Sequence, residues 1–146
     1  MDLQTYNKEF ARIYKEFDDL YHEIAFHLGL SDSAFEILYS VAVCGEGCTQ
    51  KEICQLSCTK KQTINSAIQK MAKDGVLKLE QGKGRRVYVF LTEEGRQMVA
   101  HKIEPVIQSE IAVFAEMTPQ ERAEFLRLNE KYISLLRKKV YRREWE

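Results

Sequence analysis

The chain has 146 residues, of which 45% are hydrophobic and 30% charged, and its formal net charge is zero. This composition is typical of one soluble globular domain with a real core. No apolar run approaches the roughly 20 residues that cross a bilayer, and the opening MDLQTYNKEF is too polar for a secretory signal. We therefore expect a single cytoplasmic domain over residues 1–146, with no membrane partner.

The first predicted helix carries an apolar stripe with alternating gaps of three and four residues, the heptad spacing of helices that pack against another helix. Gly29 suits the end of this helix. The stripe consists of Leu3, Tyr6, Phe10, Ile13, Phe17, Leu20 and Ile24. Together with apolar faces at 99–114 and 125–140, it exceeds what a small domain covers by itself. A homodimer is expected, and an intramolecular helical bundle is the alternative.

Three short helices are predicted next, each opened by a capping signal. The first ends at the glycines of 45–47, the second buries Ile53 and Leu56, and the third runs to Asp74 before Gly75. The predicted caps are Ser31 or Ser33 with Glu36, Thr49 with Glu52, and Thr59 with Gln62. The tight connection between the last two helices predicts a helix-turn-helix.

Strands at 76–80 and 85–91 follow, joined by a glycine-rich loop, and they predict a β-hairpin wing. Thr92 then opens a long helix that Pro105 is expected to kink, and Thr118 opens the last helix. The fold class predicted is mainly α with a small β-hairpin (α+β): a winged helix-turn-helix lobe at 31–91, flanked by helical dimerisation regions at 1–28 and 92–146.

Basic residues concentrate in one block of this neutral chain. Residues 59–90 hold eight basic and two acidic side chains, a balance of +6, which leaves −6 for the remainder. A cationic block on an acidic body is typical of a nucleic-acid footprint. On the third short helix, exposed polar residues suit base edges and phosphates. The candidate DNA-binding residues are Lys60, Lys61, Gln62, Thr63, Asn65, Ser66, Gln69, Lys70 and Lys73 on the helix, and Lys83, Arg85 and Arg86 on the wing.

The segment RRVYVFLTEEG resembles the wing-strand signature of the multiple-antibiotic-resistance regulator (MarR) family, which commonly reads Asp-x-Arg, a hydrophobic strand and Leu-Thr-x-x-Gly. KQTINSAIQKM followed by DGVL is similar to that family's recognition helix and its exit, and the order of elements matches over nearly the whole chain. The family's wing arginine falls on Arg85, whereas its acidic partner position holds Lys83. We therefore expect a more mobile and more electrostatic wing, with weaker minor-groove discrimination.

The resemblance implies a homodimer that binds double-stranded DNA, clasped by its terminal helices, and usually a repressor released by a small-molecule effector. In that family the effector cleft lies between the dimer helices and the DNA lobe, so Tyr21, Phe26 and Tyr39 are candidate lining residues. They serve equally well as core. No cofactor is predicted. The chain also lacks a phosphate-binding glycine loop, a G-x-S-x-G elbow and an H-E-x-x-H pair, so we do not expect an enzyme.

Four cysteines within 15 residues leave an alternative of the same fold, a redox- or metal-sensing regulator that uses Cys44 and Cys48. Cys48, in a loop, is the best candidate for an exposed thiol, whereas Cys54 and Cys58 suit the core. The spacing is not that of a zinc ribbon, and His22, Glu23 and His27 more often serve as solvated groups than as ligands, so no metal is predicted. A winged-helix interaction module without DNA binding is the other alternative.

Overall fold

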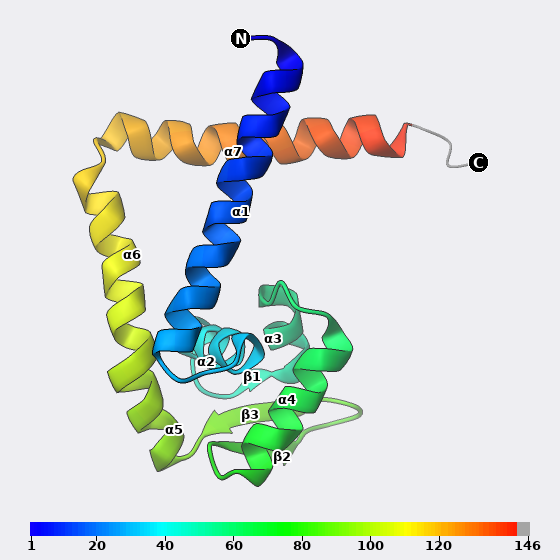
Figure 1. The fold of residues 1–146 in the computed structure, drawn as a ribbon. Coiled ribbons are helices and arrows are strands. Elements are labelled where there is room, and N and C mark those ends of the chain that lie inside the picture. The colour runs from blue at the N-terminus through cyan, green and yellow to red at the C-terminus, as the bar shows by residue number, and fades with distance from the viewer. Residues whose placement is uncertain (143–146) are drawn as a thin grey trace. The chain divides into compact units, whose positions relative to one another are not determined.

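The structure is a computed structural model that describes residues 1–142, so the last four positions of the predicted helical region 92–146 lie outside it. The chain forms two compact units, Met1–Pro105 and Val106–Glu146. Each unit is described by itself. The bounds in chain order are α1 Leu3–His27, α2 Asp32–Cys44, β1 Cys48–Thr49, α3 Gln50–Leu56, α4 Lys61–Lys73, β2 Leu77–Gln81, β3 Val87–Leu91, α5 Glu93–Met98, a π-helical segment Val99–Ile103, α6 Glu104–Glu116 and α7 Pro119–Tyr141 (Figure 1).

In the first unit, three helices and a small antiparallel sheet surround one apolar core. The strand order is β1-β3-β2, with Leu79 and Cys48 both opposite Val89. Helix α4 contacts α2, α3 and β2. The fully buried large side chains are Ile37, Leu38 and Val41 of α2, Ile53 of α3, Ile64 and Ile68 of α4, Val89 of β3 and Ile103. This arrangement confirms the predicted class, a mainly α winged helix-turn-helix.

The Leu-Thr-x-x-Gly segment connects the wing to α5, and its threonine and glycine fix the position of that helix. The Thr92 hydroxyl accepts from the Gly95 N–H at 3.1 Å, which caps α5, and donates to the carbonyls of Gly75 and Val76. Gly95 is buried, and a Cβ at that position would collide with the Val76 carbonyl oxygen. The motif therefore holds α5 against the chain that leads into β2.

Most of the predicted caps are confirmed. Thr49 and Thr118 each form a complete capping box, and Ser31 rather than Ser33 caps α2. The prediction for Thr59 is wrong: α4 begins after Lys60, which makes no side-chain cap, because Thr59 bonds elsewhere. Leu56 was expected to be buried but is 54% exposed, since α3 ends there.

Two further features were not expected from local patterns. The two-residue strand β1 was missed because it exists only by pairing with β3. Directly before Pro105, where a kink is predicted, the structure has the π-helical segment Val99–Ile103. A wider turn accommodates a proline ring and its missing N–H donor.

Long helices in both units expose apolar side chains. In the first unit α1 contacts α2, and Ala25 is its only buried residue among those described, while the heptad stripe from Leu3 to Leu20 is exposed. In the second unit, Phe114 and Phe125 meet edge to face at 6.0 Å, and residues such as Leu128 and Leu135 are about half exposed. None of the helices within residues 1–142 combines the length and apolar content that a bilayer-spanning segment requires.

We predict that Gly95→Ala lowers the free energy of unfolding by about 1–3 kcal/mol, because the added methyl forces α5 away from the Val76 carbonyl. Urea denaturation followed by circular dichroism measures the effect. Gln97→Ala in the same helix is the control, since Gln97 is exposed, and it should change stability by less than about 0.5 kcal/mol. Equal stability of the two variants would contradict the steric role of Gly95.

Candidate nucleic-acid interface

The outward face of α4 is set by what the helix buries. Ile64, Ile68 and Met71 are buried, so at about 100° per residue the opposite side of the helix holds Gln62, Gln69 and Lys73. All three are exposed. Amides can pair bidentately with an adenine edge and an ammonium can reach a phosphate, so this face suits duplex DNA.

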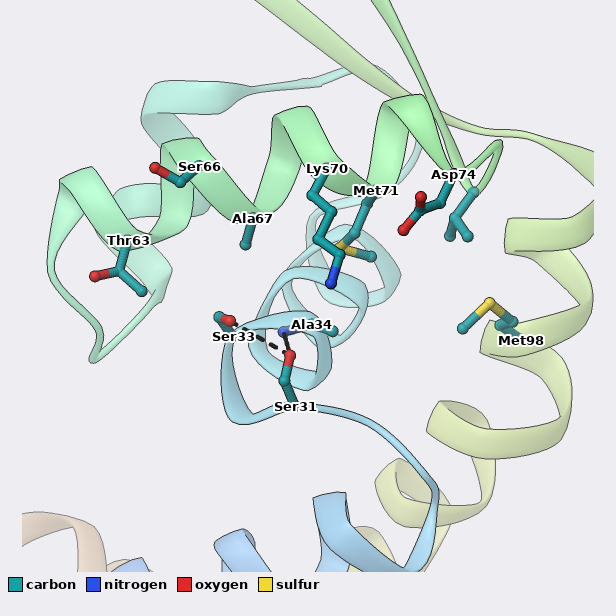
Figure 2. A pocket seen from close by; sticks show the side chains of 11 residues that line it. Ser31, Ser33, Ala34, Thr63, Ser66, Ala67, Lys70, Met71, Asp74 and Met98 are labelled. Carbon is teal, nitrogen blue, oxygen red and sulfur yellow. Dashed lines mark hydrogen bonds between the residues drawn. The ribbon is translucent and has the colours of Figure 1, made fainter.

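The other candidate residues of α4 lie at its start and along its flanks. Lys60 and Lys61 are exposed at the first turn. Thr63, Ser66 and Lys70 are exposed on the flank that borders α2, and Figure 2 shows the Lys70 side chain extending from α4 toward the start of that helix.

Asn65 is held by α3. Its Oδ1 accepts from Gln50 Nε2 at 2.6 Å and from Cys54 Sγ at 3.5 Å. The side chain is half-buried, unlike the other polar candidates on α4. In this structure Asn65 therefore ties the two helices of the helix-turn-helix together. Its predicted contact with DNA would require these bonds to be exchanged.

Glu36, expected as the second residue of a capping box at the start of α2, instead fixes the turn before α4. Glu36 of α2 accepts hydrogen bonds from the hydroxyls of Ser57, at 2.9 Å, and Thr59. Ser57 in turn accepts from the Thr59 N–H at 3.1 Å. These partners lie 21 and 23 residues from Glu36, so no local spacing signals them. Because Thr59 is engaged here, the first N–H groups of α4 have no side-chain cap and can face a phosphate.

The wing is a tight loop with cationic side chains. Gly82 N–H donates to the Arg86 carbonyl at 2.8 Å, which closes the neck, and Gly84 adopts a φ of +67°. A Cβ on Gly82 would collide with the Tyr88 ring, so glycine lets the strand and loop approach each other. The side chains of Lys83, Arg85 and Arg86 are exposed.

The basic residues of this surface are largely unneutralised. Between residues 59 and 90 the structure pairs Lys78 with Glu80 at 3.5 Å, and the other seven cations form no ion pair within residues 1–142. Elsewhere in the chain, ion pairs with acidic neighbours engage Arg12, Lys15, Arg96 and Arg127. The surface of α4 and the wing thus keeps its full positive charge for a partner.

The candidate effector residues have different surroundings. Tyr21 and Tyr39 each contact the Phe35 ring, at centroid distances of 6.3 and 5.9 Å, whereas Phe26 is 74% exposed beside His27. A pocket of about 430 Å³ that none of these three aromatic residues lines lies along α4 (Figure 2). Its lining residues are Ser31, Ser33 and Ala34 of α2 and its approach, Thr63, Ser66, Ala67, Lys70 and Met71 of α4, and Asp74, Val76 and Met98.

The expected exposures of the cysteines need correction. Cys48 is 4% exposed rather than an exposed thiol, because it lies in β1 and faces the core. Burial raises the pKa of its thiol to about 12, and neighbouring Cys44 and Glu52 add to the rise. Cys58 is exposed rather than in the core, and Cys54 is half-buried. Among the described residues, His22, Glu23 and His27 do not converge as ligands; His22 pairs with Asp32 at 2.9 Å.

Comparisons with known proteins agree with this geometry. The model of the MarR family matches residues 28–86. A MarR family regulator from Neisseria meningitidis is similar in structure with a TM-score of 0.78 and 22% identity, covering 97% of this chain and 99% of that one. MepR of Staphylococcus aureus, solved in complex with DNA, has a TM-score of 0.67 and 17% identity, covering 90% of this chain and 97% of its own.

A third similar structure is BpsR of Bordetella bronchiseptica, described as regulated in its DNA binding by 6-hydroxynicotinic acid. Its TM-score is 0.64 and its identity 18%, with 85% of this chain and 98% of that chain covered. The likeness to these solved structures is one of fold. A search of curated proteins finds no match.

We predict that Glu36→Ala lowers the free energy of unfolding by about 1–3 kcal/mol, because the Ser57 and Thr59 hydroxyls lose a charged acceptor. Chemical denaturation provides the value. Glu23→Ala removes an exposed carboxylate that has no ion pair or hydrogen bond within the described residues, and it should be nearly neutral. If both variants are equally stable, Glu36 does not anchor the turn.

Proposed function

We propose that the chain, whose residues 28–86 match the model of the MarR family, is a winged-helix transcriptional regulator of that family that binds duplex DNA through α4 and the wing. In this proposal Gln62 and Gln69 enter the major groove and contact base edges. Lys73 and the first-turn lysines contact phosphates, and Arg85 at the wing tip enters the adjacent minor groove, where negative potential attracts arginine.

One observation carries this proposal. Seven cations on α4 and the wing lack an acidic partner within the described residues, while the polar face of the same helix points away from the core. An ordinary solvated helix would be expected to mix charges of both signs, as α1 does with Arg12 and Lys15 paired to acidic neighbours. A positively charged surface beside amides that can form hydrogen bonds fits DNA, which offers phosphates to the cations and base edges to the amides.

We further propose that the functional unit is a homodimer. The apolar stripe of α1 repeats at heptad spacing over residues 3–24 and is exposed from Leu3 to Leu20, and exposed apolar residues also recur along α7. Apolar surface of this extent is typical of an association interface rather than of a free monomer. A two-fold dimer would present two α4 helices about 34 Å apart, which matches successive major grooves of a pseudo-palindromic operator.

Repression by occupation of the promoter, relieved by a small-molecule effector, is the regulatory mode that we propose. The pocket along α4 supports the second part, because Thr63, Ser66 and Lys70 border it and also belong to the candidate DNA surface. An occupant there would contact the helix that meets DNA. Control of BpsR by 6-hydroxynicotinic acid is consistent with such a mode. The aromatic set Tyr21, Phe26 and Tyr39 stays a prediction.

We predict that Lys73→Ala and Arg85→Ala each weaken binding to the gene's own upstream duplex and to a scrambled duplex alike. Lys73→Ala should reduce the salt slope of log K by about 0.9 for its lost phosphate contact, and Arg85→Ala should also make the slope shallower, because a cation leaves the DNA surface. Gln69→Ala should instead cost about 1–3 kcal/mol on the upstream duplex only, with an unchanged slope, because it loses a base contact. Fluorescence anisotropy across a salt series measures all of these quantities.

Lys8→Ala is the matched control, since Lys8 is an exposed cation on α1 outside this surface. It should leave affinity and slope unchanged. A wild-type protein without measurable DNA binding at low salt would overturn the regulator and favour a protein-interaction module. Binding that shows no preference for the upstream duplex would remove only the sequence-specific part.

We predict that Phe10→Glu with Phe17→Glu yields a folded monomer. Both rings are exposed in the single chain, so the change leaves the lobe core intact but places charge in the proposed dimer seam. Sedimentation velocity should show half the wild-type mass, with helicity checked by circular dichroism. Gln4→Glu adds charge on the opposite face of α1 and should stay dimeric. A monomeric wild-type protein at micromolar concentration would refute the homodimer.

A further inference from the structure

Two thiols and a carboxylate converge where α2, β1 and α3 meet. The ligand atoms of Cys44, Cys48 and Glu52 all lie within 4.8 Å of one another. Cys44 Sγ is 3.5 Å from Glu52 Oε2, to which it donates a hydrogen bond. Cys48 is buried, whereas Cys44 and Glu52 are exposed, so the cluster has one wall in the core and one side open to solvent.

Backbone features hold these three residues in place. Gly45, with a φ of +94°, ends α2 directly after Cys44. The Gly47 N–H then donates to the Val89 carbonyl at 3.1 Å, and Cys48 pairs with the same residue of β3. Thr49 opens α3, and its N–H donates to Glu52 Oε2 at 2.9 Å, which turns that carboxylate back toward α2. The end of α2, the pairing of β1 with β3 and the capping box of α3 therefore preorganise the cluster.

The distance between Cys44 Sγ and Glu52 Oε2 suits a tetrahedral metal site. With Zn–S near 2.3 Å and Zn–O near 2.1 Å, a sulfur and an oxygen on adjacent corners of a tetrahedron lie about 3.6 Å apart. The measured separation of Cys44 Sγ and Glu52 Oε2 is 3.5 Å. The thiol proton thus occupies the space between two atoms that a cation could bridge.

We propose that Cys44, Cys48 and Glu52 form a binding site for one thiophilic divalent cation such as Zn²⁺, with water as the fourth ligand. Binding exchanges the two thiol protons, which pass to solvent, for one ion. Three protein ligands and an open position are known for zinc, and the exposed side of the cluster leaves room for the water. The proposal does not rest on the DNA-binding function.

A peroxide-sensing thiol fits the same atoms less well. The nucleophile in such chemistry is an accessible thiolate, and the Cys48 thiol is buried in the core. A coordinated cation, in contrast, deprotonates a thiol directly. Burial among apolar residues therefore disfavours oxidation of Cys48 more than metal coordination.

An ion here would join three elements of the DNA-binding lobe. Cys44 ends the helix that supports α4, Cys48 belongs to the strand that pairs with β3 of the wing, and Glu52 lies on the first helix of the helix-turn-helix. We expect Zn²⁺ to raise the Tm of the reduced protein, because a ligand that binds only the folded state stabilises that state.

Titration of the reduced full-length chain with Co²⁺ tests the site, since thiolate-to-cobalt charge transfer reports coordinated sulfur. The wild type should take up one ion with a two-thiolate band. Cys44→Ser should about halve the band and, by chelator competition, weaken Zn²⁺ binding at least about tenfold. Glu52→Gln should keep the band but weaken binding, and because glutamine also serves at this position of a capping box, α3 stays capped.

Cys58→Ser is the matched control, because Cys58 is exposed and outside the cluster, and it should bind like the wild type. Circular dichroism verifies that each variant is folded. A wild type without a charge-transfer band overturns the proposal, as does a band that Cys44→Ser leaves unchanged. Formation of a Cys44–Cys48 disulfide in air, seen as a loss of two mass units, without metal uptake by the reduced chain, would replace it with a redox site. No DNA is present, so these outcomes are independent of the proposed regulator.

Discussion

The arrangement of the winged helix-turn-helix lobe depends on the burial of one face of α4 against α2 and the sheet. Ile64, Ile68 and Met71 enter the same core as Ile37, Leu38 and Val41, and burying each such side chain contributes about 1.5–3 kcal/mol. A rotation of the helix by one residue would expose this face, so its orientation is strongly determined. The proposals for the opposite face follow from that constraint. Because Ile64 and Ile68 are buried, the amides and ammonium groups on the other side of α4 point to solvent.

Around this core, polar side-chain contacts hold the helices and the short segments between them in place. Glu36 holds the turn before α4, Asn65 ties α4 to α3, and Thr92 with Gly95 holds α5 against the chain entering β2. The Glu36 and Thr92 contacts engage short irregular segments, whose backbone groups lack the regular partners of a helix, whereas Asn65 joins two helices. A lobe braced in this way can present its helix and wing in a defined geometry.

Charge and apolar surface are segregated along the chain. The unneutralised cations lie on α4 and the wing, while exposed apolar side chains lie on α1, α6 and α7. Although the net charge is zero, the chain has one cationic surface that suits a polyanion and one apolar surface that suits another apolar surface. The Cys44, Cys48 and Glu52 cluster lies at a third place, the junction of α2, β1 and α3, which both the wing strand and the helix-turn-helix adjoin.

The sequence by itself determined the order and type of nearly all elements, because periodicity, capping boxes and glycine stops act between residues only a few positions apart. It also placed Thr49, Thr92 and Thr118 as caps. Only the tertiary structure showed that Thr59 bonds to Glu36 instead of capping α4, that Cys48 is buried in a strand, that Leu56 is exposed, and that Glu52 faces two thiols. These features join residues distant in the chain, or depend on a strand that forms only with its partner, and no local pattern encodes them.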